Sequence, residues 1–354
     1  MKIVTVVGAR PQFIKSVPVS RELLHNNIRE VVVHTGQHYD HNMSDIFFQQ
    51  MNIPEPSYLL NINNLSHGHM TGQMLIKIEE VLLTENPDLV IVYGDTNSTI
   101  AGALAAAKLN LKVAHIEAGL RSFNMQMPEE INRILTDRIS TYLFCPTDTA
   151  IMNLKNEGFT NFDCKVIQSG DVMYDSVLLF SEFERNPSID INDEFILCTI
   201  HRQENTDNIS RLKSISEALL YISEKNKIIL PLHPRTKKRF ENLEIFQRLR
   251  SRIIFTNPVG YLEMIYLLKR CMLVMTDSGG LQKEAYFFKK PCLTLRDETE
   301  WVELVDNGYN LVCGSETETI IKNFDSIFSF EHDFGINLYG DGKAAKIIVQ
   351  EILK

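Results

Sequence analysis

Short apolar runs alternate with longer amphipathic stretches along almost the whole chain. The short runs are rich in β-branched residues and lack polar–apolar alternation, which is typical of parallel strands covered on both faces. We predict strands at residues 3–7, 30–34, 89–93, 113–116, 142–145, 166–168, 195–200, 228–232, 253–255, 273–275, 292–295 and 310–312.

The amphipathic stretches between these runs predict helices. They cover residues 13–25, 41–51, 69–84, 98–109, 128–140, 148–157, 210–225, 280–288 and 344–353. Alternating strands and helices indicate doubly wound parallel sheets. A polar stretch at 182–194 is followed by a fresh β/α series, so we expect one α/β domain at 1–170, a second at 171–340, and a terminal helix within 341–354.

The composition narrows the choice of partners. The 354 residues include 36 Lys plus Arg and 45 Asp plus Glu, a formal net charge of −9, and 44% are apolar, as in ordinary globular proteins. Nucleic acids and anionic membranes attract basic surfaces, so we expect neither as a partner. The six cysteines are scattered singly without a C-x-x-C pair, and no apolar run approaches ~20 residues. We therefore predict free thiols and a cytoplasmic protein.

Polar motifs follow several of the predicted strands. Ligands of open α/β sheets bind outside the carboxyl ends of the strands, so these motifs are the candidates for a site. If the two sheets face each other, the motifs line one cleft. They are Gly8-Ala9-Arg10-Pro11, Gly94-Asp95-Thr96-Asn97, Glu117-Ala118-Gly119-Leu120-Arg121, Gly170-Asp171, His201-Arg202-Gln203-Glu204-Asn205, His233-Pro234-Arg235 and Asp277-Ser278-Gly279-Gly280.

The glycine-rich motif of the second half predicts an anion site. Ser278, Gly279 and Gly280 open a helix directly after a strand, where backbone N–H groups can meet a phosphate. The alternative is an ordinary Ser N-cap. Glu284, one turn further, could accept hydrogen bonds from ribose hydroxyls or simply be solvated. His201 could pair with phosphate or transfer a proton, or could be a structural histidine bonded to backbone.

Two cations in the first half could also meet an anionic ligand. Arg10 follows the first strand, and Lys15 lies in the first turns of the following helix. Both could donate charge-assisted hydrogen bonds, or both could be solvated at the surface. There is no G-x-G-x-x-G or G-x-x-x-x-G-K-[ST] motif, so nicotinamide and P-loop nucleotide chemistry have no local support.

Carboxylates at strand and helix ends are candidates for proton transfer. Asp95 could serve as a base or as a helix N-cap. Glu117 ends a buried strand, whereas Glu129 and Glu130 begin a helix, where they also complement its dipole. Three carboxylates in one cleft raise the pKa of at least one of them, which general acid–base catalysis uses.

Taken together and in order, six motifs resemble the non-hydrolysing UDP-N-acetylglucosamine 2-epimerase family. The resemblance runs from residue 1 to about 305. The motifs are Gly8-Ala9-Arg10-Pro11-Gln12 with Lys15, Gly94-Asp95-Thr96, His115 to Arg121, Pro128 to Arg133, His201 to Asn205, and Thr276 to Glu284.

The resemblance implies a fold of the GT-B type, with two Rossmann-like doubly wound domains facing across a cleft that holds the UDP-sugar. It also implies that the C-terminal helix returns to the first domain and that the enzyme is a homodimer. By motif match, Ser278, Gly279 and Gly280 hold the diphosphate and Glu284 the ribose. Arg10, Lys15 and His201 lie by the diphosphate or the sugar.

The same match makes Asp95, Glu117 and Glu129 the catalytic carboxylates, with His201 beside them. The implied reaction inverts C2 by eliminating UDP to a glycal and adding it back, without a cofactor or a metal, for surface polysaccharide synthesis. Two alternatives use the same kind of fold: a GT-B glycosyltransferase, and a hydrolysing epimerase that releases UDP and free sugar.

Three departures from the family pattern concern the substrate. Gln12-Phe13 replaces the usual Glu-Ala, Trp301 stands where an Arg is common, and Tyr39 stands where allosterically regulated members carry Arg. These variants resemble the branch that acts on UDP-2,3-diacetamido-2,3-dideoxy-glucuronate. Similar chains are also assigned to UDP-N-acetylglucosamine, so both sugars stay open.

Overall fold

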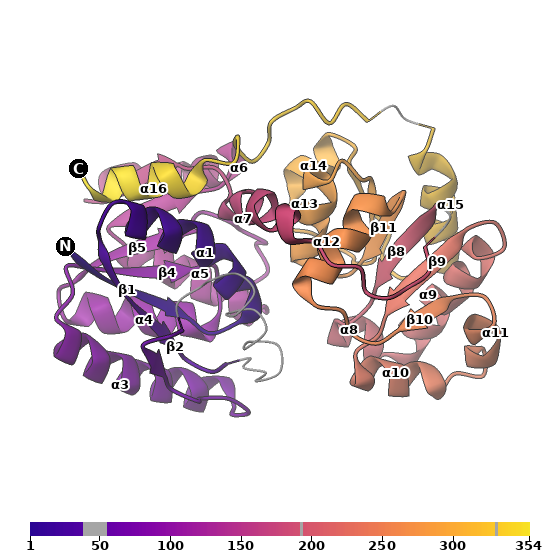
Figure 1. Ribbon diagram of the computed structural model, residues 1–354, viewed down its shortest axis with the longest axis horizontal. Helices are drawn as coiled ribbons and strands as arrows, with labels where there is room; N and C mark the ends of the chain where they lie inside the picture. The colour runs from indigo at the N-terminus through magenta and orange to yellow at the C-terminus, as the bar shows by residue number, and fades with distance from the viewer. Residues whose placement is uncertain (38–54, 192–193, 330–331) are drawn as a thin grey trace. The chain divides into compact units, whose positions relative to one another are not determined.

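The computed structural model describes residues 1–37, 55–191, 194–329 and 332–354 (Figure 1). The predicted helix at 41–51 and Tyr39 lie outside the described residues. Contacts between residues divide the chain into two compact units, which we describe one at a time. Unit 1 comprises Met1–Leu178 and Leu338–Lys354, and unit 2 comprises Leu179–Asn337.

Unit 1 contains a parallel sheet in the order β3-β2-β1-β4-β5-β6-β7. Its strands are β1 (Lys2–Val7), β2 (Arg29–His34), β3 (Tyr58–Leu59), β4 (Leu89–Tyr93), β5 (Lys112–Ile116), β6 (Tyr142–Cys145) and β7 (Lys165–Gln168). Its helices are α1 (Arg10–His25), α3 (His67–Glu85), α4 (Asn97–Lys108), α5 (Pro128–Ile139), α6 (Asp148–Asn156), α7 (Val172–Phe180) and α16 (Ala344–Ile352).

Apolar residues on both faces of this sheet are covered by helices. Ile3 and Ile91 pack beneath Val19 of α1 and Ile348 of α16, which lies beside α1 (Figure 1). Residues of the opposite face pack against α3 and α4. This burial on both faces explains why the strands are continuously apolar in the sequence.

Unit 2 repeats the design with a parallel sheet in the order β10-β9-β8-β11-β12-β13. Its strands are β8 (Phe195–Thr199), β9 (Lys227–Pro231), β10 (Ile254–Thr256), β11 (Leu273–Thr276), β12 (Cys292–Thr294) and β13 (Asn310–Val312). Its helices are α8 (Gln203–Thr206), α9 (Ile209–Ile222), α10 (Pro234–Glu241), α11 (Phe246–Arg250), α12 (Tyr261–Arg270), α13 (Gly279–Phe287), α14 (Val302–Asp306) and α15 (Thr317–Ile327).

The prediction of two doubly wound α/β domains is confirmed. In each sheet the first strand lies inside, and the strand order reverses beside it: between β1 and β4 in unit 1, and between β8 and β11 in unit 2. Ligands of doubly wound sheets bind at such switch points. The candidate residues after β1, β4, β8 and β11 are therefore where the topology places a site.

All twelve predicted strands are present, with ends shifted by a residue at several of them. The sequence did not predict β3 or the helices α7, α8, α10, α11, α12, α14 and α15. Helix α1 begins at Arg10 rather than at residue 13, because Pro11 fits the first turn of a helix. The unpredicted elements are two to eleven residues long.

The division between the units falls after Leu178, whereas the sequence pattern placed a boundary at residue 170. Helix α7 belongs to unit 1 as far as Leu178, and three hydrogen bonds attach it to that unit. Ser176 donates from its hydroxyl to the carbonyl of Ile14 in α1, at 3.0 Å. Asp175 accepts hydrogen bonds from the backbone N–H groups of Ala344 and Ala345, at 3.1 and 2.9 Å, and so caps the start of α16.

The Asp175 carboxyl gives the stability of unit 1 a pH dependence. Burial, helped by the charge of Asp171, raises its pKa to about 6 against the partial opposition of the two N–H donors. A carboxyl whose folded pKa lies above its unfolded value of about 3.9 stabilises most at low pH, and this contribution is lost as the pH rises through 6.

We expect the difference in unfolding free energy between wild type and Asp175→Asn to fall by up to ~2 kcal/mol from pH 4.5 to pH 7. Asparagine does not titrate, so the variant lacks this contribution at every pH. Urea unfolding at several pH values measures the difference. A difference that stays constant across this range contradicts the assignment.

The cysteines agree with the prediction of free thiols. The six thiols are free; five are buried and Cys164 is partly exposed. Burial raises the pKa of the Cys271 thiol to about 12, which keeps it protonated and unreactive. Within the described ranges, every helix is too short or too polar to cross a bilayer.

Candidate active site

Glu117 and Lys15 form a buried ion pair at the carboxyl end of the unit 1 sheet. Glu117 directly follows β5, and its Oε2 contacts the ammonium group of Lys15 from the second turn of α1. Only 6% of the glutamate side chain and 12% of the lysine side chain are exposed. The lysine compensates the charge of a carboxylate that has little contact with water. Removing either partner therefore leaves the other as an unpaired buried charge.

The backbone of Glu117 is held in an unfavourable conformation. Its φ of +72° lies in the left-handed region, which is strained by about 1–2 kcal/mol for a residue with a side chain. Backbone N–H groups of Glu117 and Ala118 both donate to the carbonyl of Phe144, at 3.1 and 3.0 Å, and hold the turn. Strained residues of this kind cluster at functional sites.

Asp95 follows β4 and pairs with Arg133 of α5. The distance from Arg133 Nη2 to Asp95 Oδ2 is 2.5 Å, and 30% of the aspartate side chain is exposed. Burial raises the pKa of Asp95; the cations Arg133 and Lys15 oppose the shift, whereas Glu117 and Glu129 add to it. The alternative role of Asp95 as N-cap of α4 is wrong, because Thr96 is the N-cap.

The two glutamates at the start of α5 differ in their surroundings. Glu129 is exposed, and its charge makes a small contribution to the raised pKa of Asp95. Glu130 is buried and accepts hydrogen bonds from the backbone N–H groups of Ser122 and Phe123, both at 2.9 Å. Glu130 therefore fixes a loop, while Asp95, Glu117 and Glu129 form one electrostatic group.

Arg10 is half-buried at the first position of α1, next to the turn after β1. Gln12 holds this turn in place. Its Oε1 accepts from the N–H groups of Gly8 and Ala9, at 2.8 and 3.1 Å, and its Nε2 donates to the carbonyl of Tyr93, at 2.6 Å. Gln12 thus links the loop after β1 to the end of β4.

In unit 2, the buried carboxylate of Asp277 organises the loop that carries His201. Asp277 accepts from the backbone N–H groups of His201, at 3.1 Å, and Arg202, at 3.0 Å. The ring Nδ1 of His201 lies 3.2 Å from Asp277 Oδ1, and 55% of the histidine side chain is exposed. Asn205 donates to the same carboxylate at 3.2 Å. His201 is therefore anchored at one ring nitrogen and open to solvent.

The glycine-rich start of α13 lies beside this loop in unit 2. Ser278 is the N-cap, and its hydroxyl accepts from the N–H of Leu281 at 3.5 Å, so the N-cap interpretation is confirmed. The first N–H groups of a helix have no partner within the helix and suit an anion. A Cβ on Gly280 meets nothing within 4 Å. Glu284 is buried, which contradicts the solvated alternative.

Trp301 is bound to the first turn of α13. Its indole Nε1 donates to the carbonyl of Gly279, at 2.9 Å, and the ammonium group of Lys283 lies 4.0 Å from the centre of its ring. A Cβ on Gly279 meets Glu300 Oε1 at 2.4 Å. Burial opposes ionisation of Glu300, but the charges of Arg296 and Arg202 lower its pKa overall. A hydrogen bond and a cation–π contact therefore hold the Trp301 indole against the start of α13.

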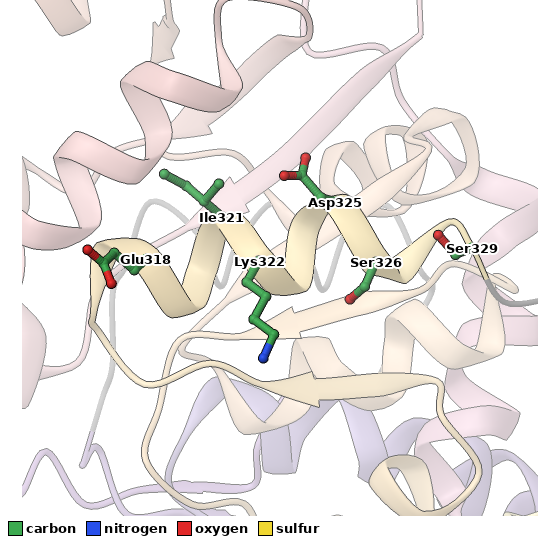
Figure 2. Close-up of a pocket in the computed structure, with 6 residues that line it drawn as sticks. All are labelled: Glu318, Ile321, Lys322, Asp325, Ser326 and Ser329. Atoms are coloured by element: carbon green, nitrogen blue, oxygen red, sulfur yellow. The ribbon is translucent and has the colours of Figure 1, made fainter.

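A surface hollow of unit 2 does not involve the predicted residues. Figure 2 shows that it follows α15 and the turn after it, with side chains of both charges. Its lining residues are Glu318, Ile321, Lys322, Asp325, Ser326 and Ser329. None of them is among the predicted site residues, and we assign no role to this hollow.

Three polar residues of the site received no individual role from the sequence: Arg133, Asp277 and Gln12. Each lies within a quoted motif but acts through a partner distant in the chain. For Asp277, a signal was present, since a carboxylate directly after a buried strand and before a glycine turn must find buried donors.

The fold and these strand-end residues define a two-domain α/β enzyme of the GT-B type. A solved structure of Methanocaldococcus jannaschii UDP-GlcNAc 2-epimerase in complex with UDP-GlcNAc and UDP matches with a TM-score of 0.91 and 45% identity, covering 100% of this chain and 99% of that chain. The predicted fold class is confirmed.

The family model described as UDP-N-acetylglucosamine 2-epimerase matches residues 21–353. The chain is 54% identical over 358 residues to UDP-2,3-diacetamido-2,3-dideoxy-D-glucuronate 2-epimerase of Pseudomonas aeruginosa, covering 100% of both chains. It is 52% identical to a UDP-N-acetylglucosamine 2-epimerase homologue of Methanococcus maripaludis, covering 99% of both. The chain belongs to the UDP-N-acetylglucosamine 2-epimerase family, and the predicted resemblance is confirmed.

Proposed function

We propose that the protein is a non-hydrolysing UDP-sugar 2-epimerase of surface polysaccharide synthesis. Besides its family, the observation that carries this proposal is the group of carboxylates at the ends of β4 and β5. Asp95 and Glu117 stand there with Lys15 and Arg133, and the pKa of Asp95 is raised. Proton transfer at a sugar carbon needs such a group, whereas transfer of a whole sugar does not.

The reaction proceeds by elimination and addition. A base removes the C2 proton, the C1–O bond breaks, UDP leaves with the bonding electrons, and a C1–C2 double bond forms. UDP oxygen then attacks C1 again, while C2 receives a proton on the opposite face. Asp95, Glu117 and Glu129 supply the acid and base groups, and both UDP and the net charge are conserved over the cycle.

The departing diphosphate requires cationic and N–H donors. We propose that Ser278, Gly279 and Gly280 bind it at the start of α13, and that Glu284 accepts hydrogen bonds from the ribose. Arg10, Lys15 and His201 stabilise the charge that develops as UDP leaves. The support for this is the free ring face of His201 and the helix start beside its loop.

Gly280→Ala tests the diphosphate site without disturbing the fold. The added Cβ contacts no protein atom within 4 Å, and alanine favours helix, so stability does not fall. The methyl group narrows the space for a phosphate, and we expect UDP to bind about tenfold more weakly, a loss of ~1.4 kcal/mol. Titration calorimetry with UDP measures this. Unchanged affinity argues against a diphosphate at Gly280.

The relative with 54% identity favours the diacetamido-glucuronate sugar as the substrate. The experiment that decides the function is incubation of the purified protein with that UDP-sugar and, separately, with UDP-N-acetylglucosamine, followed by NMR of the anomeric protons. The proposal predicts a C2 epimer from one of them. Accumulation of free UDP with free sugar identifies a hydrolysing enzyme, and turnover only with an added acceptor identifies a glycosyltransferase.

We also propose that the enzyme is a cytoplasmic homodimer. Four exposed apolar residues offer a surface on which a second copy of the chain could pack. They are Ile131 and Leu135, one turn apart on α5, and Phe123 and Met125 in the loop before it. Free thiols support a reducing compartment. Light scattering of wild type and of Leu135→Glu tests the dimer: the variant is expected to be monomeric. A monomeric wild type contradicts the proposal.

A further inference from the structure

A buried set of hydrogen-bonded side chains lies beneath the strand ends that carry Asp95 and Glu117. His115, on β5, is fully buried. Its Nε2 lies 2.7 Å from the carbonyl oxygen of Gly94, and its Nδ1 lies 2.7 Å from Asp137 Oδ1. A carbonyl oxygen only accepts hydrogen bonds, so Nε2 carries the hydrogen that it donates to Gly94.

The second oxygen of Asp137 contacts the neighbouring loop. It accepts from the backbone N–H of Gly119, at 3.2 Å, and from Arg121 Nη1, at 2.7 Å. Arg121 in turn holds Glu157 with two bonds, at 2.6 and 2.9 Å. The Asp137 carboxyl is completely buried, so all these contacts form away from water.

This arrangement joins the two loops of the candidate site. Gly94 immediately precedes Asp95, and Gly119 lies two residues after Glu117. The Gly94 turn is held through His115, the Gly119 turn through Asp137 directly, and His115 and Asp137 hold each other. This pair of side chains adds to the backbone hydrogen bond from the N–H of Gly94 to the carbonyl of Ile116, at 2.9 Å, in holding the two loops together. The strained backbone of Glu117 needs such support.

We propose that His115 and Asp137 are positioning residues that hold Asp95 and Glu117 at their working separation. Neither side chain contacts the substrate, and both act through Gly94 and Gly119. The inference rests on the proposed function, because it assigns these two carboxylates to proton transfer. A misplacement of about 1 Å in a reacting group can lower turnover ~100-fold, so the position of Gly94 matters for catalysis.

Two substitutions test the hydrogen bonds of the pair: one removes the bond to Gly94, and the other keeps every bond. In His115→Asn the amide nitrogen can take the place of Nδ1 and still meet Asp137, but no atom reaches Gly94. In Asp137→Asn the amide nitrogen can donate to Nδ1 of a neutral His115, and its oxygen can still accept from Gly119 and Arg121. Asp175→Asn is the matched control, a buried aspartate of the same unit with backbone partners at α16.

We expect His115→Asn to lower kcat about 100-fold, with UDP affinity unchanged within about threefold, because the groups assigned to UDP on α13 and α1 are all retained. Asp137→Asn keeps kcat within about tenfold of wild type, and the control stays near wild type. The measurements are kcat and KM for the epimerised UDP-sugar, UDP titration, and circular dichroism.

A folded His115→Asn with near-normal kcat overturns the proposal, and so does a parallel loss of UDP affinity. If His115→Asn fails to fold, Asp137→Asn decides, since it keeps the links to His115, Gly119 and Arg121: kcat within about tenfold supports the proposal, and a ~100-fold loss overturns it. An inactive wild type contradicts the proposed function instead, so the two failures are distinguishable.

Discussion

Glu117→Gln is expected to lower kcat by about 10³-fold, within the range for a general acid or base, and to leave UDP affinity unchanged. Glutamine has nearly the same shape but cannot take up the C2 proton. The substitution also leaves the Lys15 ammonium group without its buried carboxylate partner. Steady-state kinetics with the active UDP-sugar and calorimetry with UDP measure the two effects separately.

Glu85→Gln is the matched control. Glu85 also pairs with a lysine, Lys2. This pair lies at the end of α3 and the start of β1, so it is at the amino ends of the strands, whereas Glu117 is at the carboxyl ends. We expect its kcat to stay within about twofold of wild type, because this partly buried pair lies away from the strand ends that carry Asp95 and Glu117. A Glu117→Gln enzyme with near-normal kcat removes Glu117 from proton transfer.

Asp95→Asn is expected to lower kcat at least ~100-fold, the lower part of the general acid–base range. It also removes a feature of the pH dependence. Burial together with the charges of Glu117 and Glu129 raises the pKa of Asp95, so its carboxyl keeps a proton to higher pH than an ordinary aspartate. The limb of the kcat–pH profile that reports Asp95 therefore lies above the usual aspartate range, and it is absent from the variant.

The measurement is kcat between pH 4.5 and 9 for wild type and Asp95→Asn. Arg133, the ion-pair partner of Asp95, stays in place, so the local fold is retained. Near-normal turnover of the variant removes Asp95 from the reaction. If the same limb of the kcat–pH profile persists in Asp95→Asn, that limb reports another titrating group.

The sequence predicted the strands better than the helices. Continuous β-branched runs such as β4 have no other common structure, whereas α7 and α12 span nine and ten residues and are rich in large apolar side chains. In so short a segment the helical period cannot be told from a buried strand or loop. Packing against the sheet decides these segments, and packing is not visible in one sequence.

The candidate site shows the same limit. Asp95 and Glu117 could be predicted as site residues because each follows a strand, and parallel sheets bring the carboxyl ends of their strands together. Arg133 and Asp137 were not assigned roles, since their functions depend on partners that only the fold brings near. The alternative of Asp95 as the N-cap of α4 missed the cap by one residue, because Asp95 and Thr96 are both good capping residues.

The most direct test of the proposed mechanism is epimerisation in D2O. Elimination removes the C2 proton and addition returns one from solvent, so the account predicts that the epimer formed from the active UDP-sugar carries deuterium at C2, detected by NMR. An epimer that keeps its original hydrogen at C2 contradicts the elimination mechanism.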